Sequence, residues 1–196
     1  MRMPIADYAP SPIRIVHKML EFSRIKKGEM LYDIGSGDGR VVVEAARIYG
    51  VNCKGIEINP KLAEISRNKV DRLGLADLVG IVNGDIFDFD LRDADVVTGY
   101  LSPLAMELIE PKIFSELKPT ARFVSHDYGF PNYRSSELHL IWARSAYFPW
   151  IPFPVGHFVD VYRMINVRER KKLSNLSKVI EKEVRTAKKL NGKTPL

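Results

Sequence analysis

The sequence predicts an α/β fold built on a mainly parallel β-sheet, with helices on both faces and an antiparallel hairpin at the C-terminal end. Apolar runs of strand length alternate with segments of helical periodicity as far as residue 125. The connections between them are short, which is typical of a parallel sheet. Beyond residue 125, two strand patterns follow each other without a helix pattern between them, which predicts the hairpin. A chain of 196 residues has room for one such domain with a full core.

The N-terminal half of this pattern begins with a helix. Ser11 offers an N-cap hydroxyl and Pro12 suits the first helical position, so we expect a helix to about residue 22. Asn59 and Pro60 are expected to begin a later helix, with apolar residues at positions 62, 65, 70 and 73 and an end at Gly74. The other expected elements of this half are strands at 30–34, 53–58 and 79–82 and a helix that opens at 41.

The C-terminal half continues the alternation and then departs from it. A strand is expected at 94–98, a helix from Ser102 that Pro111 interrupts or restarts, and a strand at 122–125. The hairpin strands are expected at 138–143 and 158–165. A loop rich in aromatic residues and proline, residues 147–154, joins them.

The positive charge of the chain lies at its C-terminal end. The formal net charge is +6, but 11 of the 30 Lys and Arg residues and only three of the 24 Asp and Glu residues lie from Arg163 onward. The part that precedes Arg163 therefore carries a net charge of −2. We expect residues 1–166 to form the folded domain and residues 167–196 a basic, mostly exposed helical tail.

Several classes of protein are disfavoured by composition. No apolar run approaches the roughly 20 residues of a membrane span, and no signal pattern precedes the domain, so we expect a cytoplasmic protein. The single Cys53 excludes an intrachain disulfide and is expected to be a small buried residue. The four histidines show no ligand spacing, so the sequence predicts no metal site.

The turn after the first strand is the main functional signal. Gly35, Gly37 and Gly39 alternate between the strand and the helix that opens at 41. Glycines allow close approach of the backbone to a ligand, and the N-terminus of a helix favours acceptor groups. The spacing is Gly-x-Gly-x-Gly, whereas dinucleotide-binding turns have Gly-x-Gly-x-x-Gly. The turn therefore favours S-adenosylmethionine (SAM) over NAD, which stays the competing cofactor.

Acidic residues follow three of the predicted strands, at the sheet edge where ligands bind in such folds. Asp33 can orient the glycine turn or accept from a cofactor ammonium group, and Glu57 can accept from ribose hydroxyls. Asp85 can accept from the adenine amino group, and Ile86 can pack on the adenine face. The predicted cofactor-binding residues are Asp33, Gly35, Ser36, Gly37, Glu57, Ile58, Gly84, Asp85 and Ile86.

With these residues, the chain resembles the class I SAM-dependent methyltransferases, and more narrowly the small archaeal protein-lysine methyltransferases and their mitochondrial relatives. The resemblance extends over residues 8–165 and includes the runs 8–12, 32–40, 55–59, 84–85, 95–98 and 124–127. It implies a Rossmann-like seven-stranded sheet, and it implies that Tyr8 and Ser11 help to close over the cofactor. The family more often has Thr in place of Ser11 and Glu in place of Asp127.

Two residues near the predicted sheet edge are candidates for catalysis. Tyr100, just past the fourth strand, can border the transferred methyl group, although its ring can also simply pack under the next helix. Asp127, just past the fifth strand, can hold an incoming lysine ammonium group or accept its proton, although it can also cap its loop. His126, between the strand and Asp127, is expected to be structural.

The sequence therefore predicts an enzyme that methylates lysine ε-amines of proteins, with basic or nucleic-acid-associated substrates. An RNA methyltransferase that uses the basic tail is one alternative, but the segment Gly99 to Pro103 lacks the Asn/Asp-Pro-Pro-Tyr pattern of base-directed enzymes. A non-catalytic SAM-binding protein is another. The tail is expected to contact nucleic acid weakly at most, or to be methylated itself, since it holds seven lysines from Lys171 onward.

Overall fold

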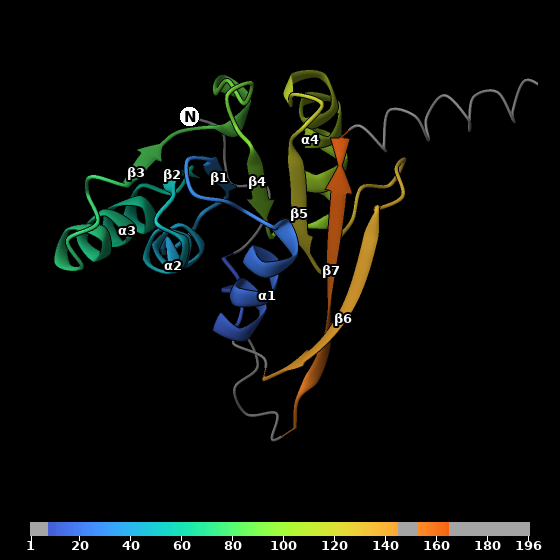
Figure 1. The fold of residues 1–196 in the computed structure, drawn as a ribbon, viewed down its shortest axis with the longest axis horizontal. Coiled ribbons are helices and arrows are strands. Elements are labelled where there is room, and N and C mark those ends of the chain that lie inside the picture. Colours follow the sequence, from blue (N-terminus) through green and yellow to red (C-terminus); the bar gives the residue numbers. More distant parts are fainter. Residues whose placement is uncertain (1–7, 145–152, 165–196) are drawn as a thin grey trace, which may run out of the picture.

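The computed structural model describes residues 8–144 and 153–164, and this part of the chain contains one seven-stranded sheet. The strand order is β3-β2-β1-β4-β5-β7-β6 (Figure 1). The strands from β1 to β5 pair in parallel, and β7 is antiparallel to both of its neighbours, β5 and β6. The predicted sheet and hairpin are thus confirmed. The strands are β1 (Met30–Ile34), β2 (Asn52–Glu57), β3 (Val79–Asn83), β4 (Val96–Gly99), β5 (Arg122–His126), β6 (Glu137–Ala143) and β7 (Val155–Arg163).

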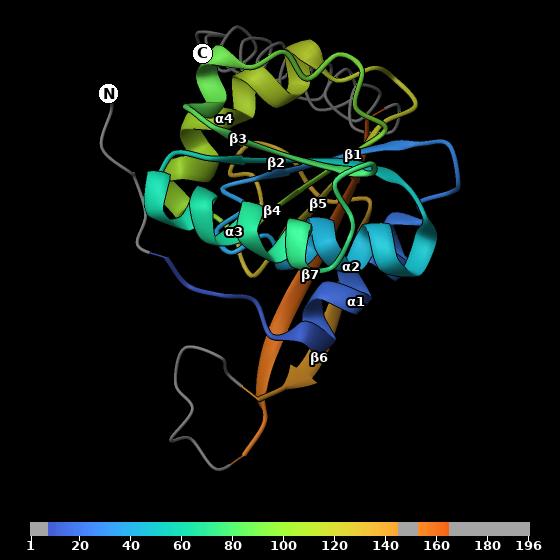
Figure 2. The ribbon, with the colours of Figure 1, turned by 90° about the vertical axis from the view of Figure 1, so that its left-hand side faces the viewer.

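Helices cover both faces of the sheet. Figure 2 shows α4 on one side and α1, α2 and α3 on the other. Because successive strand residues point to opposite faces, the short strand β1 joins both cores. Its Leu31 packs in the cluster on the α1 and α2 side, whereas Tyr32 and Ile34 pack with Met106 of α4. The helices are α1 (Ile13–Ser23), α2 (Arg40–Tyr49), α3 (Pro60–Arg72) and α4 (Pro103–Glu116), with a short 3-10 helix η1 (Ile86–Asp88).

The position of β1 determines where a ligand can bind. The chain builds β2 and β3 on one side of β1 and then crosses over to build β4 and β5 on the other. At such a switch point the loops after the two neighbouring strands diverge and leave a crevice at the carboxyl ends of the strands. The glycine turn between β1 and α2 lies at this crevice.

Two predicted helix boundaries were wrong. Pro12, not Ser11, is the N-cap of α1, and the cap makes no side-chain hydrogen bond, because Ser11 Oγ lies 2.8 Å from His126 Nδ1 instead. Pro111 neither interrupts nor restarts α4, which is continuous from Pro103 to Glu116. Proline leaves the carbonyl four residues earlier, that of Glu107, without its helical partner. Both residues are exposed, so that carbonyl can bond to water.

The apolar face of α3 also differs from the prediction. Val70 is buried as predicted, but Ile65 and Leu73 are largely exposed, and the helix buries Ala63 and Ser66 instead. Small residues on the buried face let α3 approach the sheet closely. The N-cap of α3 was predicted correctly, since the Asn59 side chain accepts from the next backbone N–H groups, at residues 61 and 62.

At the C-terminal end, β7 begins at Val155, three residues before the predicted strand. The predicted tail 167–196 and most of the aromatic loop 147–154 lie outside the described residues. Among the described residues, none of the helices has the length and apolar character that crossing a bilayer requires. Cys53 is buried as predicted, and burial raises the pKa of its thiol to about 12.

Candidate active site

The glycine turn after β1 has the backbone that its sequence implies. Gly35, Gly37 and Gly39 all have positive φ, at 68°, 53° and 75°. A Cβ atom on Gly37 would lie 2.5 Å from the ring of Tyr8, and one on Gly39 would overlap Ser66 Oγ. Both the conformation and the space therefore require glycine at positions 37 and 39. The turn lies directly against Tyr8, which belongs to the segment before α1, residues 8–12, called the leader below.

Glu57, at the end of β2, fixes the shape of this turn. Its Oε2 accepts from the backbone N–H of Gly37 at 2.7 Å, and its Oε1 accepts from that of Asn59 at 2.8 Å. The side chain is buried, and it joins the loops after β1 and β2 at the switch point. Each carboxylate oxygen can accept a second hydrogen bond, so Glu57 can organise the turn and still receive a ligand hydroxyl.

Asp33, at the end of β1, is a buried carboxyl group that faces the pocket. Its Oδ1 accepts from Thr98 Oγ1 at 2.7 Å, and no Lys or Arg lies within ion-pair distance in the part of the chain that the structure describes. Burial, with a contribution from the negative charges of Glu57 and Asp38, raises the pKa of Asp33 to about 7, although the Thr98 hydrogen bond opposes the shift. A cationic ligand group would relieve this cost.

The leader before α1 is tied to the glycine turn by an ion-pair cluster. Asp38 bonds to Arg40 at 2.8 Å and to Lys69 at 2.7 Å. Burial acts to raise the pKa of Asp38, but the hydrogen bonds and charges of these two cations lower it to about 2. Arg40 donates in turn to the backbone carbonyl of Ser11 at 2.7 Å and lies 3.4 Å from the Tyr8 hydroxyl. Tyr8 and Ser11 thus both line the pocket.

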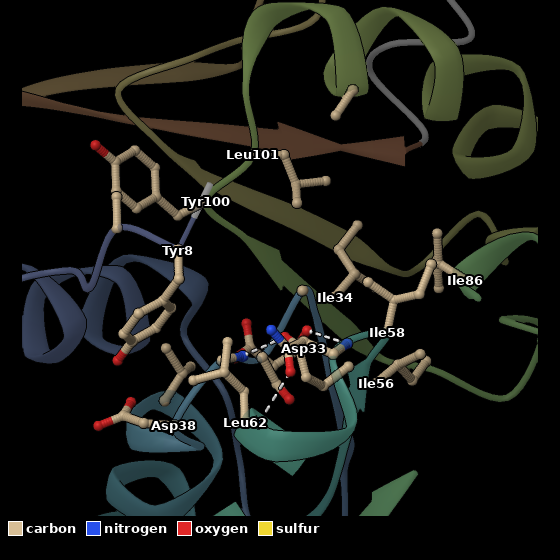
Figure 3. Close-up of a pocket in the computed structure, with 18 of the residues that line it drawn as sticks. Tyr8, Asp33, Ile34, Asp38, Ile56, Ile58, Leu62, Ile86, Tyr100 and Leu101 are labelled. Atoms are coloured by element: carbon tan, nitrogen blue, oxygen red, sulfur yellow. Dashed lines mark hydrogen bonds between the residues drawn. The ribbon is translucent and has the colours of Figure 1, made fainter. Parts of the chain in front are cut away.

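The far side of the pocket is apolar. Figure 3 shows Ile58 and Ile86 on the side opposite the rings of Tyr8 and Tyr100. Gly84 and Asp85 lie next to this side, and Asp85 begins η1, where its Oδ1 accepts from the backbone N–H of Phe87 at 3.0 Å. All eleven predicted cofactor-binding residues line this one pocket: Tyr8, Ser11, Asp33, Gly35, Ser36, Gly37, Glu57, Ile58, Gly84, Asp85 and Ile86.

Of the two candidate catalytic residues, only Tyr100 lines the pocket itself. Its ring does not pack under α4 but lies against His126, with the ring centres 4.0 Å apart. Burial raises the pKa of Tyr100 to about 12, and the charge of Asp127 contributes to this shift. The Tyr100 hydroxyl therefore stays protonated at neutral pH.

Asp127 lies outside the pocket lining but next to Tyr100, at the end of β5. Its Oδ2 lies 3.2 Å from His126 Nε2 and 3.1 Å from His157 Nδ1, while its Oδ1 accepts from the backbone N–H of Phe158 at 2.9 Å. Burial acts to raise the pKa of Asp127, but the histidine contacts and the Phe158 N–H lower it to about 2. About a fifth of the side chain is exposed (22%), so solvent and solutes reach this carboxylate.

Comparison with known proteins gives the family. The profile of the ANTKMT methyltransferase domain matches residues 33–137. A protein-lysine N-methyltransferase of Saccharolobus islandicus is 33% identical over 137 residues, which cover 69% of this chain and 85% of that protein. The chain belongs to the ANTKMT methyltransferase family. A second relative in this family, the adenine nucleotide translocase lysine N-methyltransferase of Mus musculus, is 33% identical over 136 residues, 68% of this chain and 59% of the mouse protein.

Solved structures agree with this assignment. An RNA methyltransferase of Salinibacter ruber, in complex with S-adenosyl-L-homocysteine, superposes on this ANTKMT-family chain with a TM-score of 0.69 and 34% sequence identity, covering 79% of this chain and 93% of that one. Precorrin-6y C5,15-methyltransferase of Geobacter metallireducens superposes with a TM-score of 0.62 at 17% identity, over 80% and 90% of the two chains. The second likeness concerns the fold alone.

The pocket of this methyltransferase fits SAM on its own geometry. Asp33 lacks a cationic partner among the described residues, and the amino acid part of SAM carries an ammonium group. The Oγ atom of Ser36 is buried without a hydrogen-bond partner in the described part of the chain, so a ligand group can satisfy it. The apolar side formed by Ile58 and Ile86 suits a flat heterocycle.

Sequence reasoning missed two groups of residues in this site. Asp38 and Arg40 hold the leader, and their signal was present in the glycine run itself, where a carboxylate and a guanidinium flank Gly39. His157 could not be found in this way. It lies 31 residues from His126 and reaches it only because β7 pairs with β5.

Proposed function

We propose that this chain transfers methyl groups from SAM to lysine ε-amino groups of proteins. The observation that carries the proposal is Asp127, an ionised and partly exposed carboxylate beside Tyr100 at the rim of the cofactor pocket. Within the described residues its carboxylate contacts the rings of two histidines, and it has no Lys or Arg partner there. Such a carboxylate can receive the ammonium group of a substrate lysine. The lysine methyltransferases among the relatives support the same substrate class.

The low pKa of Asp127 supports one of the two roles that the sequence left open. A group with a pKa of about 2 is a weak base, so Asp127 holds the lysine in place rather than removing its proton. Neutralising a lysine with a pKa of about 10.4 at pH 7 costs roughly 4.6 kcal/mol. Burial of the amine beside the neutral Tyr100 ring lowers that cost, because desolvation disfavours the ammonium form. The ammonium proton leaves to the solvent that reaches Asp127, and only the neutral amine, with a free lone pair, accepts the methyl group.

SAM is the methyl donor, and when bound it supplies a methyl group on a positively charged sulfur for in-line transfer to the amine nitrogen. Asp33 would hold the ammonium group of this donor, while Glu57 and the Gly37 turn that it fixes would hold the ribose side, and Ile86 would pack on the adenine. Tyr8 and Tyr100 line one side of the pocket (Figure 3). In this scheme catalysis comes chiefly from orientation of the two reactants.

A second candidate function is RNA methylation, which the Salinibacter ruber neighbour and the basic residues 167–196 favour. Against it, the loop after β4 reads Gly-Tyr-Leu-Ser-Pro and lacks the amide group that would bind a base edge. We propose that the basic residues 167–196 recruit nucleic-acid-associated protein substrates to the enzyme, which we place in the cytoplasm. The seven lysines of this segment are also candidates for self-methylation.

One experiment separates these functions. The full chain is incubated with methyl-labelled SAM and a panel of lysine-rich proteins, tRNA and rRNA fragments. Label that survives nuclease and maps to lysine by peptide mass supports the proposal. Label confined to RNA overturns it, and cofactor binding without any transfer would indicate a non-catalytic protein. Intact-mass spectrometry of the chain after incubation with SAM alone tests self-methylation.

A further inference from the structure

Three side chains beside the cofactor pocket bring their donor atoms together. His126 is the last residue of β5, Asp127 follows it directly, and His157 lies on β7. His126 pairs with Val159 in the antiparallel register, which places His157 at the same end of the sheet. His126 Nε2 lies 2.9 Å from His157 Nδ1, His126 Nε2 lies 3.2 Å from Asp127 Oδ2, and His157 Nδ1 lies 3.1 Å from the same oxygen. The three atoms form a nearly equilateral triangle.

Hydrogen bonds cannot satisfy all three sides of this triangle at once. A ring nitrogen either donates or accepts, and an ionised carboxylate only accepts. If only one of the two ring nitrogens is protonated, it can donate, but the other ring nitrogen and Asp127 Oδ2 are then both acceptors and repel each other. If both ring nitrogens are protonated, their two N–H groups repel each other across 2.9 Å. If neither is protonated, all three atoms are acceptors and no hydrogen bond forms between them.

A single cation bound to all three atoms, above the plane of the triangle, removes this conflict. Imidazole and carboxylate ligands bind zinc-class metals at about 2.1 Å, so their atoms lie about 3.0 Å apart in an octahedral site and about 3.4 Å apart in a tetrahedral site. The observed sides of 2.9, 3.1 and 3.2 Å match the octahedral spacing and lie slightly below the tetrahedral spacing that zinc prefers. Two of the three proposed ligands also have hydrogen bonds at the atoms that would not bind the metal. Ser11 Oγ lies 2.8 Å from His126 Nδ1, and Asp127 Oδ1 accepts from the Phe158 N–H. Such contacts orient metal ligands in known sites.

We propose that His126, Asp127 and His157 form a binding site for one transition-metal dication of the zinc class. The partial exposure of Asp127 gives the ion a route from solvent and leaves coordination positions for water. Because Asp127 is also the carboxylate that receives the lysine ammonium group in the proposed function, the bound metal competes with the substrate. This consequence, unlike the site itself, rests on the proposed function.

The site is tested by titrating the tag-free full chain with Zn²⁺ in calorimetry, with metal content after equilibrium dialysis as a second readout. We expect one tight site per chain, weakened at least about 100-fold in His157→Gln and in Asp127→Asn, because loss of a ligand exceeds the 10- to 100-fold cost of losing an outer contact. The matched control is His17→Gln, which removes a half-exposed histidine that pairs with Glu44 on α2. It should bind Zn²⁺ like the wild type, and thermal melting verifies that each variant is folded.

Zn²⁺ binding that neither ligand variant weakens, or that His17→Gln weakens equally, overturns the site, as does a wild-type chain that binds no Zn²⁺. The competitive consequence has its own readout. Zn²⁺ should raise the KM for the lysine substrate in the wild type and leave the affinity for SAM unchanged. If the chain methylates no protein, the calorimetric result still stands, so failure of the proposed function and failure of the metal site are distinguishable.

Discussion

Replacement of Asp33 by Asn should stabilise the free protein and weaken its binding of SAM. Asp33 is almost fully buried (4% exposed), and burial raises its pKa from 3.8 to about 7. In the unfolded chain the carboxyl group has its ordinary pKa. Between pH 4 and pH 7 the folded state therefore binds more protons than the unfolded state, and stability falls as the pH rises. Above pH 7 the folded protein carries the full cost of a buried charge.

The size of the effect follows from the shift in pKa. A shift from 3.8 to about 7 corresponds to about 4 kcal/mol, at roughly 1.4 kcal/mol per unit of pKa. Asn can still accept the hydrogen bond from Thr98, but its buried N–H₂ group needs a partner, which costs about 1–3 kcal/mol. We expect Asp33→Asn to be more stable than the wild type by about 1–3 kcal/mol at pH 8 and not at pH 4.

Urea denaturation of both proteins without cofactor, at pH 4 and pH 8, measures this difference. Exposed Asp77 provides the control, since Asp77→Asn should show no pH-dependent difference from the wild type. A stability difference between Asp33→Asn and the wild type that is the same at both pH values would refute the reasoning. So would a variant that is less stable than the wild type at pH 8.

The same substitution should cost cofactor affinity, because the neutral amide cannot compensate an ammonium group. Hydrogen bonds to charged groups contribute about 1.5–3 kcal/mol, so SAM affinity should fall about 10- to 150-fold. In the wild type, binding should release about half a proton at pH 7, since Asp33 is half protonated before the ammonium arrives. Calorimetry in two buffers of different ionisation enthalpy measures this proton. Equal SAM affinity in the two proteins would exclude Asp33 from the ammonium site.

Three further predictions concern other parts of the site. Gly37→Val should abolish SAM binding in calorimetry, because its backbone has positive φ and a Cβ would meet the Tyr8 ring at 2.5 Å; wild-type affinity would contradict the placement. Asp85→Ala should weaken SAM binding about 5- to 10-fold through loss of one hydrogen bond, and an unchanged Kd would remove Asp85 from the adenine site. Asp127→Asn should raise KM for a lysine substrate about 10- to 100-fold in steady-state assays and leave SAM affinity within twofold. A fall in kcat alone would assign Asp127 another role.

Much of the fold and cofactor pocket could be predicted because the signals are local. The alternation of strand and helix patterns determines a parallel sheet, and the turn after β1 must lie at its switch point. The acids after β1, β2 and β3 are close in space because parallel strands end at the same edge. The errors in α3 had a non-local cause. Ile65 and Leu73 have the periodicity of a buried face, but tight packing of α3 against the turn at Gly39 requires Ser66 there instead.

The side of the pocket at Tyr100, His126 and Asp127, which receives the methyl acceptor in the proposed function and is called the acceptor side below, was harder to predict. Its contacts join distant parts of the chain. Ser11 has the sequence context of an N-cap, and only the position of β5 reveals that its hydroxyl contacts His126, 115 residues away. Likewise, the partners of Asp127 depend on the register between β5 and β7. Periodicity places a residue on a face of a strand but does not give the register between strands that are distant in sequence.

A continuous series of contacts links the cofactor side of the pocket to the acceptor side. Asp38 holds Arg40, which bonds to the Ser11 carbonyl, and the Ser11 side chain bonds to His126 beside Asp127. One short leader segment therefore contacts the glycine turn through its backbone and the acceptor side through its hydroxyl. This arrangement explains why Ser11 does not cap α1, because its hydroxyl bonds to His126 on β5 and the N-cap position of the helix falls to Pro12 instead.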